Sequence, residues 1–157
     1  MRRELIKVKK QGYRVVYLDE TMVTRKTVPL TEYCLPKENM TVDMARLDEP
    51  TLALLSAISK ERGQEHYKIF ELSVNIPRFK EYLQELRQAN DDEKICLFMD
   101  NLSAHTSKKA KAEMSRLGFK AIYNVPYQPY LNPIEFCFSK FKAKFKSLRA
   151  MKLVGVI

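Results

Sequence analysis

The sequence contains no tryptophan and has little glycine or cysteine, with 4 Gly and 3 Cys among 157 residues. The cysteines, Cys34, Cys96 and Cys137, are odd in number and form no C-x-x-C pair. This pattern argues against a disulfide framework or a structural zinc site, and it favours a reducing, intracellular compartment. Because glycine is scarce and no repeat or low-complexity linker is found, we expect a single domain.

Signals for several other protein classes are also missing. No uncharged run approaches the roughly 18 residues that a membrane-spanning helix needs. The first residues, Met1 to Lys7, contain no apolar signal-peptide core. No G-x-x-x-x-G-K-[ST] loop is present, so nucleoside triphosphate hydrolysis is not predicted. We therefore expect a globular domain with no membrane partner.

Positive charge, by contrast, is in excess: 28 Lys and Arg against 19 Asp and Glu give a net charge of +9. Most of it lies at the two ends, since residues 1–14 carry a net +5 and residues 136–157 a net +6. The body between them is left at −2. Basic ends around such a body are typical of a protein that binds a polyanion, most often nucleic acid. Basic ends that only keep the chain soluble are the alternative.

The pattern of apolar residues predicts strands alternating with helices. Two short apolar runs, at 13–18 and 95–99, read as buried strands, and 119–125 reads as a third. A hairpin is expected over 51–72, and edge strands and loops are expected between residues 20 and 50. Helices are predicted from Pro77 to Asn90 with Phe79, Tyr82, Leu83 and Leu86 inside, up to Gly118 with Ala110, Met114 and Leu117 inside, and from Asn132 onward. This order predicts an α/β fold, a mixed β-sheet flanked by α-helices.

The last helix can be placed closely. Asn132 suits the N-cap, Pro133 the first helical position and Glu135 the third, near the positive end of the helix dipole. Its apolar side chains share one arc and are predicted to be buried: Ile134, Phe138, Phe141, Phe145 and Leu148. Three basic residues project on the same flank as Glu135, and they could neutralise DNA phosphates or simply face solvent: Lys142, Lys146 and Arg149. Tyr130 and Phe136 lie outside the apolar arc. They could stack on unpaired bases of DNA, but we favour an ordinary packing role for both side chains.

Two apolar strands end in an aspartate, Asp19 and Asp100. Functional groups gather at the carboxyl ends of strands in α/β sheets. Two poorly solvated carboxylates on neighbouring strands repel each other unless a cation such as Mg²⁺ lies between them. Glu135 could supply a third ligand. Taken singly, each carboxylate is better explained as a turn or capping residue, whereas the three together favour a metal site more strongly than any one of them does.

Three segments resemble the signature blocks of mariner-type DDE transposases. They are Tyr17 to Thr21, which contains D-E; Met99 to His105, which reads as D-N-x-x-x-H after its first residue; and Asn124 to Glu135, which ends in L-N-P-I-E. Between Asp100 and Glu135 lie 34 residues, a separation typical of one large branch of this superfamily. The resemblance covers roughly residues 13–150.

The resemblance implies a ribonuclease-H-like fold and metal-dependent cleavage and joining of DNA strands. Asp19, Asp100 and Glu135 would be the catalytic carboxylates and would hold two Mg²⁺ or Mn²⁺ ions. Asn101, His105 and Asn132 match motif positions that are not metal ligands. Of these, we expect Asn132 to act mainly as a helix cap and His105 to support the ligands or order their loop.

The chain departs from the family pattern in two ways. Family members carry an N-terminal helix-turn-helix region that reads the transposon ends, whereas about a dozen residues precede the first catalytic strand here. We therefore expect residues 1–157 to be one catalytic domain, acting on transposon-end and target DNA with a separate DNA-reading domain or protein, and as a homodimer. Phe138 also stands where the family usually has tryptophan.

Two alternatives from other functional classes stay open. One is an inactive, transposase-derived module for DNA binding or assembly, and the other is a ribonuclease-H-like nuclease that cuts RNA–DNA hybrids. In each case the protein would be associated with nucleic acid inside the cell, in the nucleus of a eukaryote or in the cytoplasm or nucleoid of a bacterium.

Overall fold

The computed structural model describes residues 1–24, 27, 50–91 and 93–153. Its centre is a five-stranded sheet in the order β3-β2-β1-β4-β5. The strands are β1 (Arg14–Val23), β2 (Leu52–Ser59), β3 (Gly63–Glu71), β4 (Ile95–Met99) and β5 (Lys120–Tyr123). The helices are α1 (Arg2–Lys10), α2 (Ile76–Gln88), α3 (Ser103–Thr106), α4 (Lys108–Arg116) and α5 (Ile134–Leu153), with a 3₁₀ turn, η2, at Pro129–Leu131.

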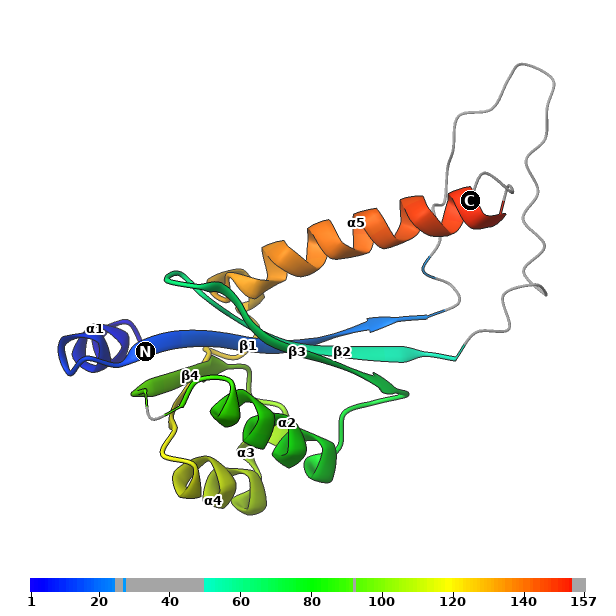
Figure 1. The fold of residues 1–157 in the computed structure, drawn as a ribbon. Coiled ribbons are helices and arrows are strands. Elements are labelled where there is room, and N and C mark those ends of the chain that lie inside the picture. Colours follow the sequence, from blue (N-terminus) through cyan, green and yellow to red (C-terminus); the bar gives the residue numbers. More distant parts are fainter. Residues whose placement is uncertain (25–26, 28–49, 92, 154–157) are drawn as a thin grey trace.

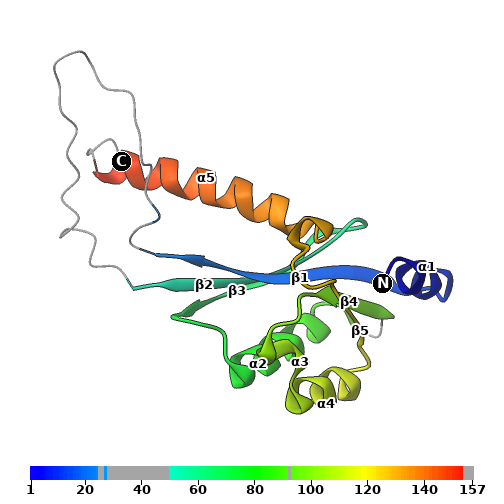
Figure 2. The same ribbon diagram turned by 180° about the vertical axis from the view of Figure 1, so that it is seen from behind.

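The sheet is mixed, as the sequence predicts. β1 pairs antiparallel with β2 and parallel with β4, while β2–β3 is an antiparallel hairpin and β4–β5 is a parallel pair. Helices α2, α3 and α4 lie on one face, and α5 crosses the other face (Figures 1 and 2). The predicted hairpin over 51–72 and strand over 95–99 are confirmed, while the strand expected over 119–125 is shorter. No helix in the described part of the chain is both long and apolar enough to span a bilayer.

The main core lies between the sheet and helices α2 and α4. The predicted inner face of α2 is confirmed, because Phe79, Tyr82, Leu83 and Leu86 are all fully buried. Asn75 caps this helix by accepting a hydrogen bond from the Arg78 backbone N–H. Gly118 follows α4 with a φ of 72°, a left-handed conformation that glycine adopts without a steric penalty. The Asn75 cap fixes where α2 begins, and Gly118 ends α4 before β5.

Helix α1 was not predicted from the sequence. Basic residues dominate it, but Val8 is buried against Val15, Cys96 and Phe98 on the other face of the sheet. The helix thus covers a patch that would otherwise expose apolar side chains near the start of β1. Of the segment expected to hold edge strands and loops, 25–26 and 28–49 lie outside the described residues. Its first residues continue β1 to Val23.

The buried face of α5 is shorter than its sequence pattern predicts. Ile134 and Phe138 are buried, Phe141 and Phe145 are half-buried, and Leu148 is 42% exposed. The helix begins over the sheet and diverges from it toward its C-terminus (Figure 1). The side of the helix that carries Leu148 therefore does not face the sheet, and the prediction that Leu148 is buried is wrong.

Candidate active site

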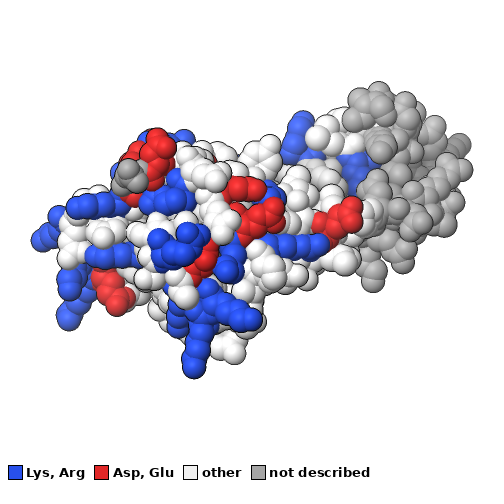
Figure 3. All heavy atoms as spheres, turned by 60° about the horizontal axis from the view of Figure 1, so that its bottom comes forward, with Lys and Arg blue, Asp and Glu red and all other residues white. Residues whose placement is uncertain are grey.

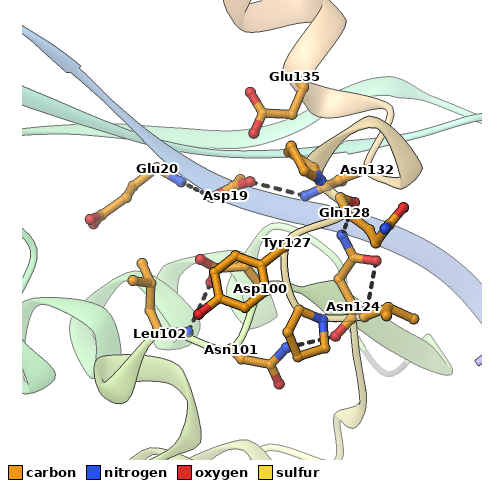
Figure 4. A pocket seen from close by; sticks show the side chains of 13 residues that line it. Asp19, Glu20, Asp100, Asn101, Leu102, Asn124, Tyr127, Gln128, Asn132 and Glu135 are labelled. Carbon is orange, nitrogen blue, oxygen red and sulfur yellow. Dashed lines mark hydrogen bonds between the residues drawn. The ribbon is translucent and has the colours of Figure 1, made fainter.

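A pocket of about 510 Å³ opens where β4 ends beside β1. Its lining includes Asp19 from β1, Asp100 after β4 and Glu135 from the first turn of α5 (Figure 4). The fold therefore brings together three carboxylates that are widely separated in sequence. We refer to this cavity as the acidic pocket.

Asp19 reaches the pocket from inside a strand. The prediction that the first strand ends at this residue is wrong, because β1 continues to Val23 while paired with β2. The parallel pairing of β1 with β4 stops at Tyr17 and Phe98, so Asp19 lies just beyond its neighbouring strand. Its side chain is 8% exposed, and its Oδ1 accepts a hydrogen bond of 2.8 Å from the Glu20 backbone N–H.

Asp100 is held by the turn and short helix that follow β4. Its Oδ1 lies 2.7 Å from Nδ1 of His105 and accepts a hydrogen bond of 3.2 Å from the Leu102 N–H. His105 is fully buried, and its ring packs on Phe79 with the centroids 4.6 Å apart. A histidine beside a carboxylate favours the tautomer that carries its proton on Nδ1. The structure therefore places His105 against Asp100, in a position to orient it.

Asn132 contacts the other aspartate. Its Nδ2 donates a hydrogen bond of 3.1 Å to Oδ2 of Asp19, and its side chain is 2% exposed. The prediction that it serves mainly as a helix cap is wrong, because its side-chain oxygen accepts no hydrogen bond from the described N–H groups of α5 and its amide donates to Asp19 instead. Its buried Oδ1 has no hydrogen-bond partner among the described residues.

A chain of asparagines holds the loop between β5 and α5. Asn101 Nδ2 donates to the Asn124 carbonyl at 2.6 Å, and Asn124 Nδ2 donates to the Gln128 carbonyl at 2.7 Å. Asn124 is buried, and its Oδ1 also accepts from the Val125 N–H. Sequence reasoning selected Asn101 but missed Asn124, although an asparagine between a strand and a proline-rich loop is a typical turn-forming residue.

The pocket concentrates negative charge. The pKa of Asp19 is raised to about 6, first by burial and then by the charges of Asp100 and Glu135, although the Glu20 N–H and His105 oppose the shift. The pKa of Glu20 is also raised, mainly by burial. Within the described chain, no Lys or Arg forms an ion pair with any of the three motif carboxylates. The one ion-pairing partner recorded for them is His105, at Asp100.

The donor set suits a hard divalent cation. Carboxylate and amide oxygens are the ligands that Mg²⁺ and Mn²⁺ prefer, and the pocket supplies carboxylates together with the unpartnered Oδ1 of Asn132. Mutual repulsion among carboxylates is relieved when a cation lies between them. In the described residues, no three His, Cys, Asp or Glu side chains are grouped closely enough to hold an ion as they stand.

A second cavity, of about 500 Å³, runs along α5 and shares Glu135 with the acidic pocket. Lys142 and Lys146 line it, on the flank where the helical spacing places them. The prediction that Arg149 projects beside them is wrong, since Arg149 is 7% exposed and donates to the Thr24 carbonyl at 2.9 Å. We refer to this cavity as the α5 groove.

The face that carries α2 and α4 has a different charge pattern. There, Lys and Arg side chains are interspersed with Asp and Glu (Figure 3). Lys68 pairs with both Glu81 and Glu85, and Arg116 pairs with Glu113. Interspersed charges of both signs partly cancel each other's field, so this face is a weaker candidate for binding a polyanion than the α5 groove.

Comparison with known proteins places the chain in a family. A family model described as "DDE superfamily endonuclease" matches residues 14–154, and the chain therefore belongs to the DDE superfamily of endonucleases. No curated protein sequence matches significantly. The family match confirms the DDE assignment made from the three motif blocks.

Solved structures confirm the predicted ribonuclease-H-like fold class. The Mos1 transposase paired-end complex with left transposon end has a TM-score of 0.68 and 18% identity, covering 90% of this chain and 46% of that one. The catalytic domain of Mos1 mariner transposase has a TM-score of 0.63 and 16% identity, covering 90% and 66%. A Mos1 mariner paired-end complex with Mn has a TM-score of 0.66 and 19% identity, and the match covers 88% of this chain and 45% of that one. The chain thus spans about half the length of the transposases in these complexes.

Proposed function

We propose that residues 1–157 form one transposase catalytic domain that cuts and joins DNA strands with divalent metal ions. The observation that carries the proposal is the convergence of Asp19, Asp100 and Glu135 on one pocket, with no Lys or Arg of the described chain paired to them. Uncompensated carboxylates in a cleft are typical of a functional site, because a structural role would favour neutralising them. The family of the chain and its likeness to Mos1 transposase support this choice of chemistry.

Asp19, Asp100 and Glu135 would hold two Mg²⁺ or Mn²⁺ ions. Ions bound there would activate a water or a DNA 3′-hydroxyl as the nucleophile and would stabilise the leaving oxygen. Solved Mos1 complexes with Mn and with Mg support this choice of metal.

The residues around the carboxylates fix their orientation. Asn132 donates to Oδ2 of Asp19, and the buried His105 contacts Oδ1 of Asp100, so each aspartate has one oxygen held by a side chain. Positioning of this kind lowers the entropy cost of assembling a metal site. Both are positioning residues in the proposal, and Asn101 acts further out by tying the loop after β5 to the end of β4.

DNA would approach the pocket along the α5 groove. Lys142 and Lys146 would neutralise phosphates on the strand that leads to Glu135, because they line a cavity that shares this residue with the acidic pocket. Arg149 is not part of this path, since its side chain is buried. In the proposal the partners are transposon-end and target DNA, a second copy of the chain and a separate DNA-reading domain or protein, at an intracellular DNA-associated location.

The proposal is tested by incubating the protein with nicked and pre-cleaved duplex DNA in Mn²⁺. Wild-type protein is expected to cut or join the strands, and Asp100→Asn should lower the rate about a thousand-fold. Glu20→Gln is the matched control, because Glu20 is a neighbouring pocket carboxylate outside the proposed ligand set. Equal rates for wild type and Asp100→Asn would refute the ligand assignment.

The same experiment separates the alternatives. An inactive binding or assembly module would bind DNA with an affinity that falls steeply with salt, yet would cut nothing in any metal. A nuclease for RNA–DNA hybrids would cut a hybrid duplex in preference to DNA of the same sequence. Either outcome would replace the proposed function.

A further inference from the structure

The rim of the acidic pocket carries a tyrosine in an unusual state. Tyr127 lines the pocket, and its side chain is 99% exposed. Its φ is 60°, the left-handed region that side chains with a Cβ rarely adopt. A large aromatic residue that is both solvent-exposed and strained is poorly explained by folding, because burial and relaxation would both stabilise it.

The surrounding loop holds Tyr127 in place. The amide of Asn124 bridges the loop by donating to the Gln128 carbonyl, and Asn101, after β4, donates to the Asn124 carbonyl (Figure 4). Pro126 and Pro129 on either side restrict the backbone further. The ring is therefore presented by a fixed support rather than by a free loop.

Two other exposed aromatic residues lie close in sequence, but they differ from Tyr127. Tyr130 is 74% exposed and Phe136 is 66% exposed, so the packing role expected for them is not what the structure shows. Neither lines the acidic pocket. Phe136 already has a cation partner, Lys140, with Nζ 4.6 Å from its ring centroid. Tyr127 is the aromatic residue that the pocket itself presents.

We propose that Tyr127 is a stacking platform for one unpaired nucleobase, the base next to the phosphate that enters the acidic pocket. This inference rests on the proposed function for its ligand, DNA. Asp19 is 8% exposed within the pocket while the ring is 99% exposed at its rim. A base left unpaired at a nicked, frayed or cleaved strand end has lost a stacking neighbour, and an exposed ring at the rim of the pocket can replace it.

Stacking on Tyr127 would also supply affinity for DNA at the acidic pocket, where no positive side chain of the described residues does so. The motif carboxylates repel a phosphate until metal ions are bound, and Lys142 and Lys146 lie along the α5 groove rather than at Tyr127. Every base has a π-face, so the platform would hold a base without reading the sequence. Its role is to fix the nucleotide beside the reacting phosphate.

The test uses the full chain and a synthetic duplex with a short single-stranded 3′ extension, whose first unpaired base is 2-aminopurine. Ca²⁺ replaces Mn²⁺, so that binding is measured without cutting. Wild type should quench the fluorescence of the probe. Tyr127→Ala should lose the quenching and bind roughly 5- to 100-fold more weakly. Tyr127→Phe should keep both properties.

Tyr130→Ala is the matched control and should behave as wild type, since Tyr130 is exposed on the same loop but outside the pocket lining. An abasic site at the probe position should lower the affinity of wild type for the duplex to that of Tyr127→Ala, and it should leave the affinity of that variant unchanged. Alanine tolerates the left-handed φ no better than tyrosine, so circular dichroism should show the same fold in both.

The outcomes separate this inference from the proposed function. Equal quenching and affinity in wild type and Tyr127→Ala would overturn the platform, even if the chain cuts DNA in Mn²⁺. Quenching that depends on Tyr127, without any cleavage in Mn²⁺ or Mg²⁺, would support the platform and refute the catalytic proposal. Failure of wild type to bind the probe would overturn both.

Discussion

Strand β1 takes part in two charged sites, and they are built in opposite ways. At its start, Arg14 lies among Arg62, Glu65, Asn90 and Glu93, a group that we refer to as the arginine cluster. Arg14 Nε is 3.0 Å from Oε1 of Glu65, whose side chain is 1% exposed. Arg14 and Arg62 also both contact Glu93 and Asn90. Every buried charge in this cluster has an opposite charge beside it.

Further along the same strand, Asp19 faces two other carboxylates and no arginine or lysine ion pair among the described residues. Its pKa is raised to about 6, whereas a carboxylate beside a cation has its pKa lowered. A chain that can neutralise buried carboxylates with arginine at one site leaves them uncompensated at the other. This contrast is what distinguishes a structural charge cluster from a site prepared for a charged ligand.

The largest expected effect is on catalysis and would come from Glu135. This side chain is exposed, so Glu135→Gln should leave the melting temperature nearly unchanged. If Glu135 is a metal ligand, the rate of DNA cleavage in Mn²⁺ should fall about a thousand-fold. Single-turnover kinetics on nicked duplex would measure this, with Lys140→Ala as a control on the same helix. A change of only a few-fold would remove Glu135 from the proposed ligand set.

The next effect is on stability and comes from the arginine cluster. Arg14→Met leaves Glu65 buried without its partner, and we expect the free energy of unfolding to fall by about 3–5 kcal/mol. The double variant Arg14→Met, Glu65→Met should recover much of the loss, because no unpaired charge remains. Urea denaturation would measure both. A loss below about 1 kcal/mol for the single variant would show that the cluster contributes no more than a surface ion pair.

The acidic pocket should respond in the opposite direction. Asp19→Asn removes a charge whose pKa is raised from 3.8 to about 6, so it should stabilise the metal-free protein by about 1–2 kcal/mol at pH 7. The single amide oxygen can accept from either Asn132 Nδ2 or the Glu20 N–H but not from both, and this loss is why the expected gain is modest. Thermal unfolding in EDTA would show the gain, and added Mn²⁺ should then stabilise wild type more than the variant. Destabilisation in EDTA would contradict the contrast between the two sites.

Local sequence patterns predicted the elements whose apolar residues form a short continuous run or a regular period. The strand at 95–99, the hairpin over 51–72 and the inner face of α2 follow from short-range periodicity and turn residues, and the structure confirms them. The motif carboxylates were selected by type and context, and the fold gathers them in one pocket. The elements and the motif blocks depend on residues close together in the chain, whereas the gathering of the carboxylates depends on the fold.

What escaped prediction depends on distant partners. β1 continues past Asp19 because β2 pairs with it there, although β4 does not. Asn132 donates to Asp19 across 113 positions instead of capping its own helix. Leu148 is exposed and Arg149 is buried because the path of α5 over the sheet, which periodicity cannot supply, decides which side meets the protein. Tyr127 was missed because its exposure follows from the loop that presents it.

The smallest expected effect is on the pH dependence of stability, and it compares a paired carboxylate with the unpaired Asp19. Glu113 is a paired carboxylate, and hydrogen bonds from Arg116 and then Gln84 lower its pKa from 4.5 to about 2. The stabilisation of the folded protein by charged Glu113 is therefore present above pH 4.5 and is lost as the pH falls toward 2. Charged Asp19 instead destabilises the folded protein, and this cost appears as the pH rises from 3.8 through about 6.

Glu113→Gln should thus lower the free energy of unfolding by about 1 kcal/mol at pH 6, a modest value because Arg116 is exposed, and by almost nothing near pH 2. Asp19→Asn should show its largest gain above pH 6 in EDTA and none near pH 3. Denaturation of the three proteins across this range would measure both differences. If the free energies of unfolding of both variants changed in the same direction relative to wild type as the pH rises, the contrast between the paired Glu113 and the unpaired Asp19 would be refuted.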